Sequence, residues 1–144
     1  MSAARNRVNI TLMPSTEPIV PFPKVLVLEE DGALREAMRM LLNAEGYCVL
    51  PAASLSAALS LARSEPGIEV LLVEDPLPDG TIGAQAIASL REVIGVQLKA
   101  LLLTQHLSSS LRELEQDGRV RLATSPIGAD ELIAKLQALR GNGR

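Results

Sequence analysis

Acidic and hydroxyl side chains stand within a few residues of the ends of the short aliphatic runs of this sequence. They are Glu29, Glu30 and Asp31 after residues 25–28, Glu74 and Asp75 after residues 70–73, Thr104 after residues 100–103, and Ser125 after residues 120–123. Carboxylates that converge on one site repel one another, so they bind a cation, pair with Lys or Arg, stay solvated or take up a proton. Oxygen ligands of this kind suit Mg²⁺ held by one or two carboxylates plus water.

The aliphatic runs alternate with stripes of apolar residues at helical spacing. Runs without polar alternation are typical of strands that are covered on both faces. The predicted strands are 25–28, 47–50, 70–73, 100–103 and 120–123. The last is expected at an edge of the sheet because it contains basic residues. The predicted helices carry the apolar stripes Leu34/Met38/Leu41/Leu42, Leu55/Ala58/Leu59/Ala62, Ile87/Leu90/Ile94, Leu107/Leu111/Leu114 and Leu132/Leu136/Leu139. Five strand–helix units predict an α/β fold with an open, doubly wound parallel sheet. Ligands of such sheets bind outside the carboxyl ends of the strands, where the polar residues lie.

Length and composition predict one domain with two short extensions. Residues 1–23 contain four prolines among polar residues and are expected to form a flexible arm, residues 24–140 the domain, and residues 141–144 a tail. The net charge of -3, without a Lys/Arg run, argues against nucleic-acid and membrane partners. No apolar run approaches ~20 residues and no signal sequence opens the chain, so we expect a cytoplasmic protein. Cys48, the single cysteine, is expected to be a small buried hydrophobe, and His106 a solvent-facing loop residue.

At these residues the chain resembles the receiver domain of bacterial response regulators, from Lys24 to Arg140. Residues 25–31 are similar to the family's first strand and its acidic pair, residues 70–80 to its third strand and following loop, and Ser125-Pro126 stands where the family has Lys-Pro. The resemblance implies a five-stranded, CheY-like and flavodoxin-like sheet of order 2-1-3-4-5 and a role in two-component phosphorelay signalling. In that family an Asp at the end of strand three accepts a phosphoryl group from a histidine kinase, with Mg²⁺ held by the acidic pair.

This sequence departs from the family at each functional position. Glu74 occupies the phospho-acceptor position, and its additional methylene moves the carboxylate by roughly 1 to 1.5 Å. Thr104 and Ser125 occupy the phosphoryl-clamp positions, and Ser125 lacks the lysine charge. Leu122 replaces the aromatic switch, and Gln105 follows the hydroxyl residue where the family usually has a small one. Glu29, Glu30 and Glu74 are the candidate ligands for Mg²⁺, which we expect to bind weakly at most.

The combined departures predict a degenerate receiver that acts by protein–protein contact and is not an enzyme. Because Arg144 ends the sequence, we expect a stand-alone domain whose partner is a histidine kinase or another signalling protein, with no cofactor beyond weakly bound Mg²⁺. The alternatives are a working single-domain response regulator and, on the same fold, a flavin or nucleotide binder, which the acidic loop after the first strand disfavours. Glu74 is either a partial mimic of the phosphorylated state or a relic. Asp75 is a poor substitute nucleophile because neighbouring strand residues point to opposite faces.

The turn that follows the fifth predicted strand must present residue 125 to the site whatever its side chain is. We therefore predict the cis peptide between Ser125 and Pro126 that is common in the family's Lys-Pro. A cis X-Pro bond costs only roughly 0.5 to 1 kcal/mol.

Overall fold

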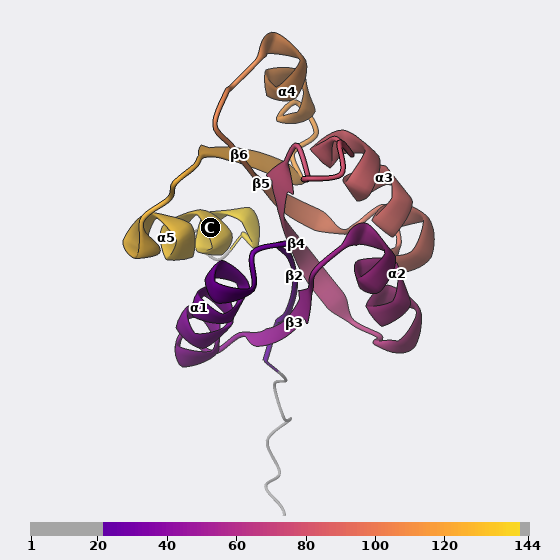
Figure 1. Cartoon of the computed structure of the whole chain (residues 1–144), viewed down its shortest axis with the longest axis vertical. Coiled ribbons are helices and arrows are strands. Elements are labelled where there is room, and N and C mark those ends of the chain that lie inside the picture. The colour runs from indigo at the N-terminus through magenta and orange to yellow at the C-terminus, as the bar shows by residue number, and fades with distance from the viewer. Residues whose placement is uncertain (1–21, 142–144) are drawn as a thin grey trace, which may run out of the picture.

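A computed structural model describes residues 22–141, which form a five-stranded parallel sheet with helices on both faces (Figure 1). The strands are β2 (Lys24–Leu28), β3 (Cys48–Ala52), β4 (Ile68–Asp75), β5 (Lys99–Thr104) and β6 (Val120–Thr124). Their order across the sheet is β3-β2-β4-β5-β6. This is the predicted order 2-1-3-4-5 of a flavodoxin-like fold. Its reversal point lies between β2 and β4, whose carboxyl ends carry the acidic residues.

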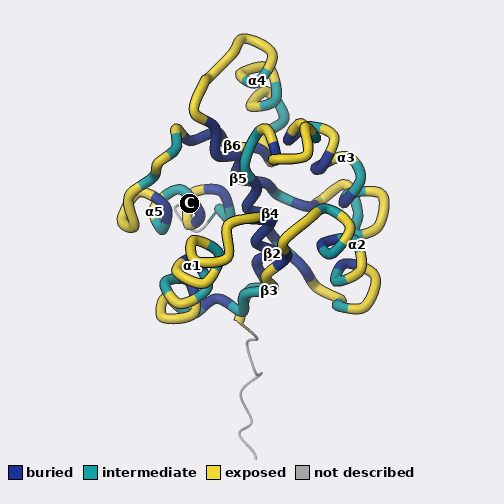
Figure 2. Tube along the Cα trace, viewed as in Figure 1, coloured by how far each residue is buried: buried dark blue, intermediate teal, exposed yellow. Residues whose placement is uncertain are grey.

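Five helices connect the strands. They are α1 (Gly32–Ala44), α2 (Leu55–Ser64), α3 (Gly83–Ile94), α4 (Ser109–Leu114) and α5 (Ala129–Leu139). In Figure 1 α1 and α5 lie on one side of the sheet and α2 and α3 on the other. The two buried clusters follow this division, because alternate residues of each strand point to opposite faces. The strands other than the edge strand β3 form the dark, buried centre of Figure 2, and the helices expose their outer faces.

The helices begin and end close to where the sequence predicts, with two differences. Leu34 was expected in the core stripe of α1, but 45% of its surface is exposed. Leu107 was expected in the fourth helix, but α4 starts only at Ser109 because the Ser108 hydroxyl caps it by accepting from Leu111 N at 3.1 Å. The second strand starts at Cys48 and not at Tyr47, and Cys48 is half-buried where full burial was expected.

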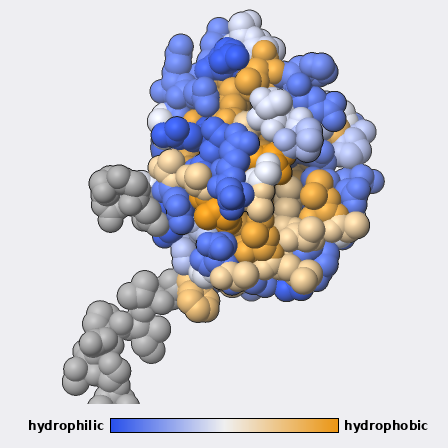
Figure 3. Space-filling view, turned by 90° about the vertical axis from the view of Figure 1, so that its left-hand side faces the viewer, coloured by the Kyte–Doolittle hydropathy of each residue, from blue (hydrophilic) through white to orange (hydrophobic). Residues whose placement is uncertain are grey.

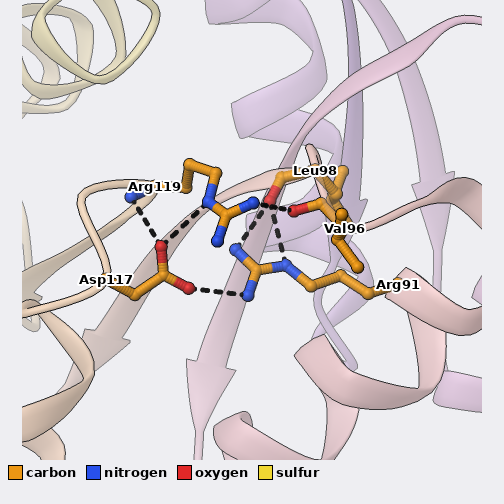
Figure 4. A network of polar contacts seen from close by, with 5 residues as sticks. All are labelled: Arg91, Val96, Leu98, Asp117 and Arg119. Carbon is orange, nitrogen blue, oxygen red and sulfur yellow. Dashed lines mark hydrogen bonds and ion pairs between the residues drawn. The ribbon is translucent and has the colours of Figure 1, made fainter.

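A charged network holds the turn before β6 (Figure 4). It lies at the amino-terminal ends of the strands, away from the acidic residues at their carboxyl ends. Asp117 Oδ2 accepts from Arg91 Nη1 at 2.9 Å, and Asp117 Oδ1 accepts from Arg119 Nε at 3.0 Å. Arg91 also donates to the carbonyl of Leu98, and Arg119 to that of Val96. The network therefore joins α3, the start of β5 and the start of β6.

The predicted arm falls largely on residues 1–21, and the predicted tail on residues 141–144, of which only Gly141 is described. Both predictions lie mainly outside the described residues. Within residues 22–141 no helix is long and apolar enough to cross a membrane.

Candidate functional site

The acidic residues at the end of β4 point to opposite faces of the sheet. Val70 and Leu72 face α1 and α5, and Leu71 and Val73 face α2 and α3. Glu74 continues the first face. Asp75 continues the second, where its Oδ1 accepts a hydrogen bond from the backbone N of Gly83 at the start of α3. Asp75 points to the opposite face from Glu74, as predicted, and there one of its oxygens already has a structural partner at the start of α3.

Glu74 meets the carboxyl group of Glu29, which follows β2. Glu29 is buried, with 6% of its surface exposed. Burial raises the pKa of Glu74, and the charge of Glu29 and a hydrogen bond to its carboxyl raise it further, against the opposing effect of the Glu30 backbone. Among the described groups no donor reaches Glu74 Oε1, which is buried. A proton shared between the two carboxyls would satisfy this oxygen, because two ionised carboxylates can only accept.

The loop after β2 uses much of its hydrogen-bonding capacity on itself. Glu29 Oε2 accepts from Asp31 N at 3.0 Å. Asp31 Oδ1 caps α1 by accepting from the backbone N of Ala33 and of Leu34 at 2.9 and 3.1 Å. Asp31 is therefore a helix cap and is not available to the site.

Arg35 is a basic residue of this region that sequence reasoning missed. From the first turns of α1 its Nη1 donates to the carbonyl oxygen of Glu29 at 2.8 Å and to that of Glu30 at 3.2 Å. Its position four residues after the cap Asp31 was visible in the sequence, but its return to the loop depends on a side-chain rotamer. Arg35 thus fixes the loop through backbone oxygens.

The three predicted metal ligands fit a Mg²⁺ site poorly. Glu29 and Glu74 face each other, whereas Glu30 is exposed on the loop. Across residues 22–141 no group of three or more His, Cys, Asp or Glu side chains is arranged so that it could hold a metal ion. Weak Mg²⁺ binding at most stays a prediction.

The predicted clamp residues Thr104 and Ser125 line the larger cavity with Glu74, whereas the predicted switch residue Leu122 packs in the buried cluster on the α2–α3 side of the sheet. The hydroxyl of Thr104 donates to the carbonyl of His106 at 3.1 Å and accepts from its backbone N at 3.2 Å. Leu122 is buried, and its backbone N donates to Glu115 Oε2 at 2.9 Å. The peptide between Ser125 and Pro126 is cis, as predicted. His106 is exposed, also as predicted.

Two cavities flank this group of residues. The larger, of about 480 Å³, lies between α3 and α4 and is lined in part by Asp75, Thr104 and Gln105. The smaller, of about 240 Å³, lies between α1 and α5. Glu74, Leu103 and Ser125 line both cavities. The structure therefore brings Glu29, Glu74, Thr104 and Ser125 together, and it sets Glu30 apart at the surface.

Comparison with known proteins supplies the family context of this geometry. No family model matches the chain. The response regulator MprA of Mycobacterium sp. (strain KMS) is 35% identical over 118 residues, which are 81% of this chain and 50% of that protein. The transcriptional regulatory protein KdpE of Mycobacterium tuberculosis is 29% identical over 114 residues, 79% of this chain and 49% of that protein. The chain spans about half the length of these curated relatives.

Solved structures agree with the sequence matches. The CheY-like receiver domain from Methanospirillum hungatei JF-1 superposes with a TM-score of 0.72 at 19% identity, covering 84% of this chain and 95% of that one. The described domain therefore has the fold of CheY-like receiver domains, and its sequence is similar to response regulators. The receiver domain of the hybrid histidine kinase CckA has the same fold, with a TM-score of 0.66 at 24% identity over 81% of this chain and 98% of that one. These likenesses establish the fold of the receiver domain.

Proposed function

We propose that this receiver domain of a two-component response regulator acts by binding other proteins, without ordinary aspartyl phosphorylation. The observation that carries the proposal is the contact between Glu74 and Glu29. A phospho-acceptor must be ionised and aligned with the incoming phosphorus, because in-line attack depends on position within a fraction of an ångström. Glu74 turns its longer side chain to a second carboxyl group, and burial together with that carboxyl raises the pKa of Glu74, which disfavours the ionised form.

The remaining site residues support the proposal. Ser125 offers no positive charge to a phosphoryl group, and a charge-assisted contact of that kind is worth about 1.5 to 3 kcal/mol. The hydroxyl of Thr104 is already bonded to the backbone of His106. A phosphoryl group at Glu74 would therefore lack both partners that hold it in the family.

The proposed partners are a histidine kinase or another signalling protein in the cytoplasm. The domain has the receiver fold but no basic run and a net charge of -3, which makes nucleic acid an unsuitable partner. The domain would work as a binding module and not as an enzyme. Whether Glu74 imitates a phosphoryl group depends on its ionisation, and a protonated Glu74 carries no charge with which to do so.

A working response regulator is the second candidate, and Asp75 is the observation that favours it. Its carboxylate lines the larger cavity together with Thr104 and Ser125. For Asp75 to react, an oxygen of its carboxylate would attack the phosphorus of phosphohistidine while the P–N bond breaks and the electron pair leaves with the histidine. Its Oδ1, however, is held by Gly83 N at the start of α3.

Phosphoryl uptake from acetyl phosphate with Mg²⁺, followed by intact mass spectrometry, tests the proposal. We expect no added phosphoryl mass on the natural sequence. The double variant Glu74→Asp with Ser125→Lys restores the acceptor and its cationic partner and should gain acid-stable, base-labile phosphate. Uptake by the natural sequence would refute the proposal. Loss of that uptake in Asp75→Asn would then identify Asp75 as the acceptor.

A further inference from the structure

The smaller cavity is an apolar recess with an acidic floor. Its walls come from α1 and α5 and the turn before α5, and its floor from the ends of β2 and β4. The apolar walls include Leu34, Met38, Leu41, Ile127 and Leu132, and the acidic floor consists of Glu29 and Glu74. Figure 3 faces the α1–α5 side of Figure 1 and shows apolar side chains gathered in the middle of this face. The exposure of Leu34, which the core does not explain, belongs to this recess.

No cation of the described chain lies in the recess. Its lining contains neither Lys nor Arg, and neither Glu29 nor Glu74 forms an ion pair within residues 22–141. The nearby Arg35 donates to the backbone carbonyls of Glu29 and Glu30. Ser125 also lines the recess, but its hydroxyl group carries no charge.

Two facing carboxyls without a cation, that of the buried Glu29 and that of the half-buried Glu74, are satisfied in one of two ways. Either they retain a proton, or a positive group enters from outside, because two ionised carboxylates in contact repel each other at short range. The buried Oε1 of Glu74, without a donor, is the atom such a group would contact.

We propose that this recess binds a primary ammonium group on a short aliphatic stem. An ammonium offers three hydrogen-bond donors and one charge, which suits two facing carboxyls. An aliphatic stem suits the walls of Leu, Met and Ile, as lysine stems do on apolar surfaces. A cavity of about 240 Å³ has the volume of roughly eight waters, enough for an amine of five or six carbons.

The ammonium can come from a free amine or from a lysine of a partner protein, and the two sources present the same chemistry. The inference uses Glu29 and Glu74, as the proposed function does, but binding of an amine requires no phosphoryl donor. Either claim can therefore fail without the other.

The test is an amide chemical-shift titration of the domain with n-pentylamine hydrochloride at constant ionic strength and pH. We expect saturable shifts confined to α1 and α5 residues that line the recess, with half-saturation at millimolar amine. The neutral analogue 1-pentanol should give no saturable response there. Blocked lysine (Nα-acetyl-lysine N-methylamide) as a second ligand distinguishes the sources: tighter binding than pentylamine indicates a partner's lysine, and weaker binding a free amine.

Three variants control the titration. Ser125→Lys places an ammonium in the recess and should abolish pentylamine binding, and Glu74→Gln should weaken it about tenfold. Glu92→Gln, which removes an exposed carboxylate on α3, should leave it unchanged. The amide spectrum of each variant shows whether it is folded. Equal binding of pentanol, unaltered binding by both Ser125→Lys and Glu74→Gln, or no saturable shift in the natural sequence would overturn the proposal.

Discussion

Glu74 titrates in contact with a second carboxyl group, and this makes the stability of the domain depend on pH. Its pKa is raised in the folded state, first by burial and then by Glu29. A raised pKa means that the folded state binds the proton more tightly than the unfolded chain. The stabilisation from Glu74 is therefore fully present below the unfolded pKa of about 4.5 and is lost as the pH rises through the folded pKa.

Glu74→Gln should remove this dependence, because the amide is neutral at every pH and has the shape of the protonated acid. We expect its free energy of unfolding to exceed that of the natural sequence by less than about 1 kcal/mol at neutral pH, because solvent screens the half-exposed carboxyl, and the two to converge in acid. Urea unfolding between pH 4 and pH 8 measures both. Glu92→Gln is the matched control and should show no such gain. A Glu74→Gln variant that is less stable at neutral pH would mean that the charge on Glu74 stabilises the fold.

At the residue scale the sequence predicted most of the positions that meet, although Glu30 lies apart at the surface, and it did not predict what their side chains bond to. Glu74, Thr104 and Ser125 follow strands whose carboxyl ends share one edge, so their convergence was predictable. The turn of Thr104 onto the backbone of His106 and the reach of Arg35 to the loop carbonyls depend on rotamers and on loop geometry. These have no periodic signal in a sequence.

At the scale of elements, the start of α3 leaves no room for a side chain at Gly83. A Cβ there would run into Leu102 Cδ1 and lie 3.1 Å from Asp75 Oδ1. Leu102 is fully buried and cannot move aside cheaply. Gly83→Ala should therefore cost about 1 to 3 kcal/mol of unfolding free energy despite the better helix propensity of Ala.

Gly118→Ala is the comparison, because nothing lies within 4 Å of its Cβ position. Its effect on the free energy of unfolding, measured by urea unfolding, should be within about 0.5 kcal/mol. Equal effects of the two substitutions would contradict the close packing of α3 on β5.

The second prediction at the scale of elements concerns the charged network around Asp117. Hydrogen bonds from the backbone of Arg119, and from the side chains of Arg91 and Arg119, lower the pKa of Asp117 to about 2. A lowered pKa gives stability that is present above the unfolded pKa of 3.8 and is lost as the pH falls towards 2. Asp117→Asn should lower the unfolding free energy by about 1 to 2 kcal/mol at pH 7, with a difference that shrinks below pH 4.

Urea unfolding at a series of pH values measures this difference, with Glu113→Gln on the exposed face of α4 as control. A constant difference from pH 7 to pH 3 would assign the loss to something other than charge.

The sequence could not pair Arg91 with Asp117, which lies 26 residues away, because such pairs depend on how a loop returns. The sequence did predict the strands and helices, because aliphatic runs and apolar stripes at helical spacing mark the residues that become buried.

At the scale of the whole molecule, the order of the strands came from the resemblance and not from the pattern alone. Alternating strands and helices predict a parallel, doubly wound sheet, but several strand orders satisfy that pattern. The short aliphatic runs ending in acidic residues and the Pro-containing turn at residue 126 selected one of them. The short α4 and the exposed Leu34 escaped prediction because apolar spacing indicates a helical face without showing whether anything covers it.

The most direct measurement of the central claim is an amide chemical-shift titration with Mg²⁺ and then with Mg²⁺ plus beryllofluoride, which imitates a phosphoryl group. The amides of Glu30, Glu74, Thr104 and Leu122 report on the loop, the acceptor position, the clamp and the switch. We predict no saturable shift that spreads from Glu74 to Leu122 in the natural sequence. We predict such a shift in the double variant Glu74→Asp with Ser125→Lys. A saturable response of the natural sequence at millimolar reagent, extending from Glu74 into β6, would contradict the claim that this receiver works without phosphorylation.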